Sequence, residues 1–204
     1  MDEDILEPSM QQYQIFHVGG TSGSFINIIF SHYLQHLGVD IDAKKLLVDF
    51  TGSCHQVARC PGDKTHWIDK LDSNKKTIAI DFDEDDKKII ATMVFEKIIM
   101  FLILKDPTLL QRKWPNSAVS TINWRDRELL KKTFVENPDL LIFYDWKQQL
   151  ERANPVLILR FKDIMFGDIN GIVAKFFQTE RLIKLDNFIK EYRKINQKYL
   201  DILR

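Results

Sequence analysis

A turn rich in glycine, serine and threonine near the N-terminus is the first candidate for chemistry. It follows an apolar segment, residues 13–18, for which we expect a strand, and it precedes an apolar helix expected over residues 24–37. The residues of the turn are Gly19, Gly20, Thr21, Ser22, Gly23 and Ser24. Glycines allow backbone conformations closed to other residues, and successive N–H groups at a helix start can bind an anion. The turn predicts a cradle for a phosphate or sulfate group, and an ordinary tight strand-to-helix connection is the alternative.

This turn lacks the lysine of the common nucleotide-binding loop. That loop ends in Gly-Lys-Ser or Gly-Lys-Thr, and its lysine reaches the β- and γ-phosphates of the nucleotide. No lysine lies between Gly19 and Phe25. The absence counts against binding of a nucleoside triphosphate in the usual way.

A second candidate is the tripeptide Lys64-Thr65-His66, which follows a Pro-Gly-Asp turn. Histidine exchanges a proton near neutral pH, and a lysine two residues away can face the same site in an extended segment. Such a lysine would stabilise developing negative charge. A solvated loop is the alternative for the tripeptide taken alone. His55 follows a Gly-Ser pair and is kept as a further candidate.

A metal site is a weaker hypothesis. The potential ligands fall within a short segment: Cys54, His55, Cys60 and His66. Their spacing is not that of a zinc ribbon or finger, and no second cysteine pair exists, so we expect no metal. Asp81 begins an acidic run and could hold magnesium beside a nucleotide, although such runs are more often solvated helix starts.

Composition narrows the class of protein. The chain has 204 residues, of which 45% are hydrophobic, and 29 basic side chains balance 29 acidic ones. This balance gives no electrostatic basis for generic nucleic-acid binding. Two cysteines and the absence of a signal-peptide pattern indicate a cytoplasmic protein. The longest apolar stretch, residues 89–104, is interrupted by charges and is too short to span a bilayer, so we expect a buried helix and no membrane partner.

Alternating strands and helices predict an α/β fold with three layers, α/β/α, around a mainly parallel sheet. Strands are expected over residues 13–18, 46–50, 77–82 and 156–161. Helices are expected from the acidic run to residue 104, over residues 125–135, after Asp168, and along an amphipathic C-terminal segment; residues 51–72 are expected to be loop-rich. We expect a single domain over residues 1–204, with residues 1–12 as a tail.

Four segments, in the same order along the chain, resemble the P-loop sulfotransferase family. Residues 20–24 resemble its loop for the 5′-phosphosulfate, and Lys64-Thr65-His66 resembles its Lys-Thr-His element. Residues 76–92 stand where the family has a strand, Arg-x-Pro-x-Asp and a helix. Residues 156–164, Val-Leu-Ile-Leu-Arg-Phe-Lys-Asp-Ile, resemble its late strand with an Arg-Tyr-Glu-Asp-Leu-like end, and this match is the closest.

The resemblance implies a transferase that moves a sulfuryl group from 3′-phosphoadenosine 5′-phosphosulfate to an acceptor hydroxyl. In this reading the turn binds the donor, His66 is the base and Lys64 assists the sulfuryl group. Two departures stand out. Thr21 occupies the position of the family's loop lysine or arginine, and the acidic run replaces the Arg-x-Pro element, whose arginine holds the donor's 3′-phosphate.

Two other functions stay open at this stage. A small P-loop kinase acting on a nucleotide or metabolite would bind ATP with magnesium, with Asp81 near the metal. A domain that kept the fold and lost the donor would serve as a binding or assembly module, and the two departures favour it.

Overall fold

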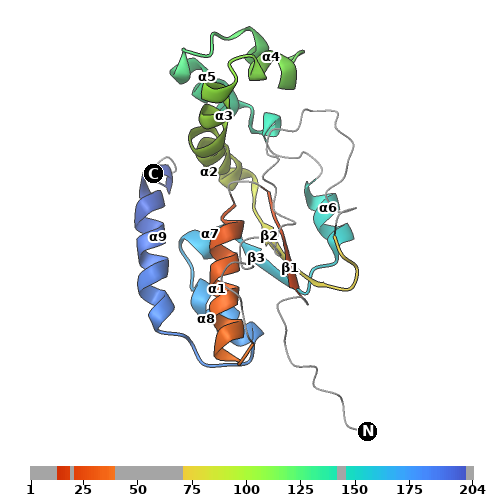
Figure 1. Cartoon of the computed structure of the whole chain (residues 1–204), viewed down its shortest axis with the longest axis vertical. Helices are drawn as coiled ribbons and strands as arrows, with labels where there is room; N and C mark the ends of the chain where they lie inside the picture. The colour runs from red at the N-terminus through yellow and green to blue at the C-terminus, as the bar shows by residue number, and fades with distance from the viewer. Residues whose placement is uncertain (1–12, 19–20, 40–70, 142–145, 201–204) are drawn as a thin grey trace.

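Three short strands form a parallel sheet in the computed structural model, which describes residues 13–18, 21–39, 71–141 and 146–200. Strand β1 is Tyr13–Phe16, β2 is Lys76–Asp81 and β3 is Leu157–Arg160, in the spatial order β1-β2-β3. Because all three strands run the same way, their carboxyl ends meet at one edge of the sheet (Figure 1). The predicted α/β class with a parallel sheet is confirmed.

The helices of the described residues lie between and beside these strands. Their bounds are α1 Gly23–His36, α2 Glu84–Val94, α3 Met100–Lys105, α4 Leu109–Lys113, α5 Arg127–Glu136, α6 Trp146–Ala153, α7 Phe161–Met165, α8 Ile169–Phe176 and α9 Lys184–Leu200. A π-helical turn, Phe95–Ile99, joins α2 to α3, and two short 3₁₀ turns cover Ala118–Thr121 and Pro138–Leu140. Figure 1 shows α1, α8 and α9 on one side of the sheet and α6 on the other.

Neighbouring residues of β1 belong to different hydrophobic cores, as side-chain alternation along a strand requires. Ile15 packs with Ile78 among residues of α1, α8 and α9. Phe16 packs with Ala79 among residues of α2, α5 and α6. Both faces of the sheet are therefore covered at β1 and β2, which explains the near-continuous apolar sequence of these strands. In the edge strand β3 one face is open among the described residues, since Ile158 is 49% exposed.

Helix ends follow the sequence signals closely. Helix α1 stops where Gly38 adopts a left-handed backbone with φ 86°, and the amide of Val39 then donates to the Leu34 carbonyl. Asp83 caps α2 by accepting from the Asp86 amide, and Asp168 caps α8 by accepting from the Gly171 amide. The predicted helix start at the acidic run and the predicted Asp168 cap are confirmed.

Several boundaries differ from the predictions. Strand β3 ends at Arg160, because Phe161 already belongs to α7, a short helix that the apolar pattern hid. The predicted apolar face of α9 included Ile195, yet this side chain is 70% exposed. The predicted strand over residues 46–50, most of the predicted loop over 51–72, and the predicted tail over 1–12 lie outside the described residues.

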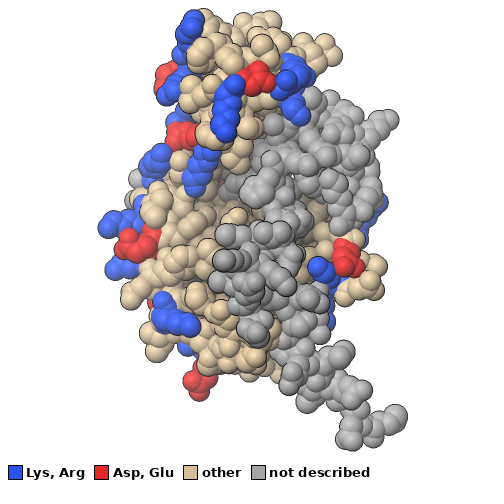
Figure 2. All heavy atoms as spheres, in the orientation of Figure 1, with Lys and Arg blue, Asp and Glu red and all other residues tan. Residues whose placement is uncertain are grey.

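No helix of the described residues is long and apolar enough to cross a membrane. The helical segment after the acidic run is largely buried up to Ile103, as predicted, although Phe101 and Leu104 are exposed. On the face drawn in Figure 2, lysine and arginine side chains are interspersed with acidic ones rather than gathered into one basic patch.

Asp86 is a buried carboxyl group in the first turn of α2. Its Oδ2 accepts from the Asp83 amide, and its Oδ1 has no hydrogen-bond partner among the described residues. Burial raises the pKa of Asp86 to about 6, because the charged form loses its hydration. Its neighbour Asp83 accepts a hydrogen bond from Lys162, which lowers the pKa of Asp83. Within this capping box the pKa of Asp83 is thus lowered and the pKa of Asp86 is raised.

We expect Asp86→Asn to change how stability depends on pH. A raised native pKa means that the contribution of Asp86 to stability is full in acid and is lost as pH rises through about 6, by at most about 3 kcal/mol. The melting temperature of the variant relative to wild type should therefore increase between about pH 4.5 and about pH 7.5. The exposed Asp85→Asn is the matched control for loss of one charge at the same helix start, and an identical pH trend in both variants would contradict the assignment to Asp86.

Candidate functional site

The turn between β1 and α1 lies at the carboxyl edge of the sheet, where ligands of parallel α/β sheets bind. Of its predicted residues, Thr21 to Ser24 are described, and Gly19 and Gly20 lie outside the described residues. Ser22 precedes α1 with a left-handed backbone, φ 71° and ψ 24°, and its side chain makes no capping bond to the helix. The first amides of an α-helix have no carbonyl partner within the helix, so an anion at this turn would meet donors.

Gly23 begins α1 in close contact with His17. A Cβ atom at this position would overlap the imidazole ring. The ring is buried, and its Nδ1 lies 2.9 Å from the Val18 carbonyl oxygen, so it has little freedom to move away. The glycine is therefore required by the close approach of strand end and helix start, whatever the turn binds.

Replacing Gly23 with alanine should lower the free energy of unfolding by about 1–3 kcal/mol, the usual cost of overpacking. The cause would be the overlap with His17, so the double variant His17→Ala/Gly23→Ala should lose less than the sum of the two single changes. Urea unfolding of all three variants measures this coupling.

Ser24→Ala is the control, because Ser24 is exposed in the same turn and should change stability by less than about 0.5 kcal/mol. Strict additivity of the His17 and Gly23 changes would contradict the overlap.

Thr21 faces the inside of the turn. Its side chain is fully buried, and its hydroxyl donates to the Val18 carbonyl at 2.5 Å, while its amide donates to the same oxygen at 3.2 Å. This residue holds the backbone of the turn closed. Contacts with an anion therefore fall to the neighbouring backbone amides and to Ser22 rather than to the Thr21 hydroxyl.

The Ser22 side chain is held by the C-terminal helix. The Tyr192 hydroxyl, from α9, donates to Ser22 Oγ at 2.6 Å. The Tyr192 ring stacks on Phe25 of α1 with 3.8 Å between ring centroids and 13° between planes. The last helix of the described chain thus contacts the turn directly.

Paired charges line the carboxyl ends of β2 and β3. Lys147 of α6 donates to both oxygens of Asp81, at 2.6 and 2.7 Å. Lys162 of α7 donates to Asp83 at 2.6 Å. Two acidic residues, at the end of β2 and just before α2, are therefore paired with lysines from later in the chain. The carboxylate considered for a magnesium ion, Asp81, is occupied by an ion pair.

The predicted catalytic residues Lys64, His66 and His55 lie outside the described residues, as do Cys54 and Cys60. Whether they reach the turn stays a prediction. Among the residues that the structure does describe, no group of three or more histidine, cysteine, aspartate or glutamate side chains is placed to hold a metal ion.

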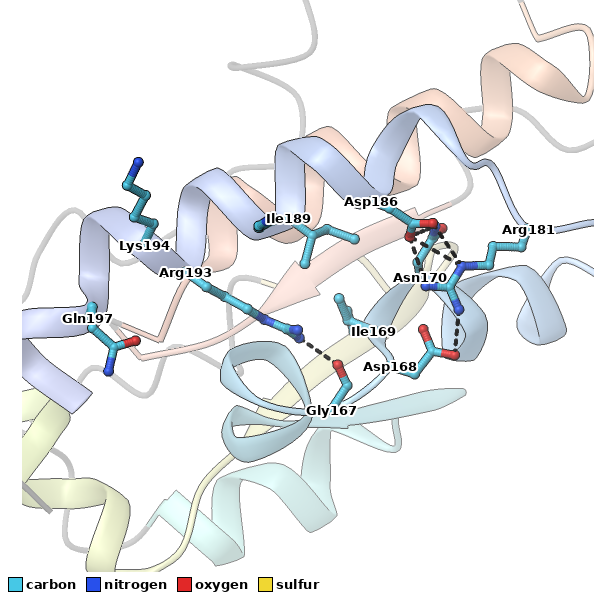
Figure 3. A pocket seen from close by; sticks show the side chains of 11 residues that line it. Gly167, Asp168, Ile169, Asn170, Arg181, Asp186, Ile189, Arg193, Lys194 and Gln197 are labelled. Atoms are coloured by element: carbon cyan, nitrogen blue, oxygen red, sulfur yellow. Dashed lines mark hydrogen bonds and ion pairs between the residues drawn. The ribbon is translucent and has the colours of Figure 1, made fainter. Parts of the chain in front are cut away.

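A cavity of about 450 Å³ lies between α8 and α9 (Figure 3). The charged groups at its centre are bound to one another or to backbone. Arg181 pairs with Asp168 and Asp186, each at 2.8 Å. Arg193 donates to the carbonyl oxygens of Ile164 and Gly167. These interactions join α7, α8 and α9, and they indicate a structural role for the polar groups of this cavity.

Sequence reasoning did not select the residues that support the turn. His17 had a usable signal, because it stands between the strand and the glycines. Tyr192, Lys147 and Lys162 had none, since their partners lie far away in the sequence.

Comparison of the chain with protein-family models, with curated proteins and with solved structures finds no match. The evidence on function is therefore the chain's own residues and their geometry.

Proposed function

We propose that the chain binds a nucleotide phosphosulfate donor at the β1–α1 turn and transfers its sulfuryl group to an acceptor hydroxyl. The observation that carries the proposal is the geometry of the turn. Ser22 has a left-handed backbone immediately before α1, and the first amides of α1, which have no carbonyl partner within the helix, lie at the carboxyl edge of a parallel sheet. The order of the four sulfotransferase-like segments supports the choice of donor.

The charge arrangement at the sheet edge supports donor binding. An uncompensated acidic run beside the turn would repel a bound phosphate. Lys147 and Lys162 pair with Asp81 and Asp83, which offsets this repulsion. Arg160, at the last position of β3, is exposed beside the same edge. These cations make the edge compatible with an anionic donor despite the missing Arg-x-Pro element.

In the proposed reaction the acceptor oxygen forms a bond to sulfur while the bond from sulfur to the bridging phosphate oxygen breaks. The acceptor proton passes to His66, and Lys64 stabilises the charge that develops on the bridging oxygen. The products are a sulfate ester and adenosine 3′,5′-bisphosphate. The turn amides and the Ser22 hydroxyl hold the donor's 5′-phosphosulfate through neutral hydrogen bonds.

Adenosine 3′,5′-bisphosphate should raise the melting temperature of the protein, and ATP with magnesium should raise it less. A ligand at about 100 times its dissociation constant stabilises by about 2.7 kcal/mol, which gives a shift of roughly 5–10 °C for a chain of this length. A shift with ATP and magnesium alone would overturn the choice of donor in favour of a kinase.

Lys64→Ala and His66→Ala should each lower the rate of sulfuryl transfer by roughly 100-fold or more, as for loss of a general base or a charge-stabilising group. Binding of adenosine 3′,5′-bisphosphate to these variants should remain close to wild type. Lys132→Ala, an exchange of an exposed lysine outside the motif, is the control. An unchanged transfer rate in both test variants would show that the roles are wrong.

A binding module without transfer activity is a second candidate, favoured by the position of Thr21. The family's basic loop residue would contact the transferring group with a charge-assisted bond, roughly twice as strong as a neutral one. Here the replacing side chain is buried and bonded to the Val18 carbonyl. A melting temperature that neither nucleotide changes would support a binding module over a transferase.

A further inference from the structure

The contact between Tyr192 and Ser22 joins the C-terminal helix to the candidate donor turn. The two residues are 170 positions apart in the sequence, and 2.6 Å separates their oxygens. Ser22 is half-buried, and its neighbour Ser24 is exposed, so the bond lies at the border between the protein interior and the surface of the turn.

Tyr192 is held in place by the stacking of its ring and by the hydrogen bonds of the residue that follows it. Its ring stacks on Phe25, which also stacks on Phe188 with 5.4 Å between ring centroids. The next residue, Arg193, donates to the carbonyl oxygens of Ile164 in α7 and of Gly167 just after α7, at 2.9 and 2.6 Å. Burial raises the pKa of Tyr192, which keeps the phenol protonated and able to donate. The position of the hydroxyl is therefore set by the packing of α9.

The bond leaves the Ser22 proton for another acceptor. A serine hydroxyl has one proton to donate and two lone pairs that accept. One lone pair of Ser22 Oγ is taken by Tyr192, and Ser22 Oγ donates no hydrogen bond to another of the described residues. Its proton is thus not used within the first turn of the helix. This proton is available to an acceptor atom of a ligand that lies at the first amides of α1.

We propose that Tyr192 is a positioning residue that makes Ser22 a dedicated hydrogen-bond donor to the phosphate or sulfate oxygens of the ligand at the β1–α1 turn. The inference deepens the proposed function and depends on it for the identity of the ligand. It also accounts for a neutral turn that holds an anion, since a hydroxyl with a fixed direction joins the backbone amides in place of the absent basic side chain.

The decisive variant is Tyr192→Phe, which keeps the ring stack on Phe25 and removes only the hydroxyl. Calorimetric titration with adenosine 3′,5′-bisphosphate should show about fivefold weaker binding than wild type, and Ser22→Ala about tenfold weaker binding. The double variant should bind no more weakly than Ser22→Ala, because Tyr192 acts through Ser22. Tyr13→Phe, the same change at a buried tyrosine at the start of β1, should bind like wild type.

Two results of the titration would overturn the inference. One is wild-type affinity in Tyr192→Phe, and the other is strict additivity of the Tyr192 and Ser22 changes. In a transfer assay the KM for the donor should rise in Tyr192→Phe while the KM for the acceptor stays, which a general loss of stability would not produce.

A measurement without ligand separates this inference from the proposed function. The amide of Ile26 donates to the Ser22 carbonyl at 3.0 Å, so its hydrogen exchange reports on the turn. Exchange at Ile26 should become at least about threefold faster in Tyr192→Phe, while the amide of Phe30 in mid-helix should be unchanged. Unchanged exchange at Ile26 overturns the inference. Faster exchange in a protein that does not bind the nucleotide overturns the proposed function and leaves Tyr192 as the residue that positions Ser22.

Discussion

The fold depends on a short parallel sheet whose strands β1 and β2 must be covered on both faces. Adjacent residues such as Ile15 and Phe16 point to opposite sides of the sheet, so one layer of helices cannot bury both. Helix α1 has to turn back immediately after β1 to cover one face, and this sharp return brings Gly23 against His17. The geometry of the candidate site is thus a product of the packing requirement as much as of ligand binding.

The charges at the carboxyl edge of the sheet are also set by the way the elements pack. Parallel strands place their last residues together, so the acidic run after β2 would accumulate negative charge beside a proposed anion site. Lysines from α6 and α7 reach these carboxylates, and burial raises the pKa of Asp86 to about 6. The edge becomes nearly balanced through residues that are far from the acidic run in the sequence. Such balance is compatible with a ligand held by directed dipoles rather than by net positive charge.

Local signals in the sequence predicted local features of the structure well. The stop of α1 at Gly38, the acidic start of α2 and the Asp168 cap each depend on one or two residues and their immediate neighbours. The strand that precedes the glycine turn and the helix that follows it were predicted for the same reason. These elements place Thr21 to Ser24 at the carboxyl edge of a parallel sheet, and the anion cradle expected there stays a prediction.

Features that arise from distant contacts could not be predicted. The pairing of Lys147 with Asp81 and of Tyr192 with Ser22 requires knowledge of which helices pack together. Residue 195 was assigned to the apolar face of α9 because its spacing fits, yet no neighbour covers it among the described residues. Short helices such as α7 were not predicted, because five residues give too little periodicity to separate a helix from a strand.

The π-helical turn between α2 and α3 accommodates one residue more than an α-helical turn. The amide of Met100 donates to the Phe95 carbonyl, five residues earlier, instead of the usual four. Removal of one residue from this turn would restore a regular helix and leave the helix beyond it facing the same way. Met100 and Ile103 of α3 would then stay buried, and Phe101 and Leu104 would stay exposed. A change in length by one residue can therefore be absorbed within this turn without re-orienting α3.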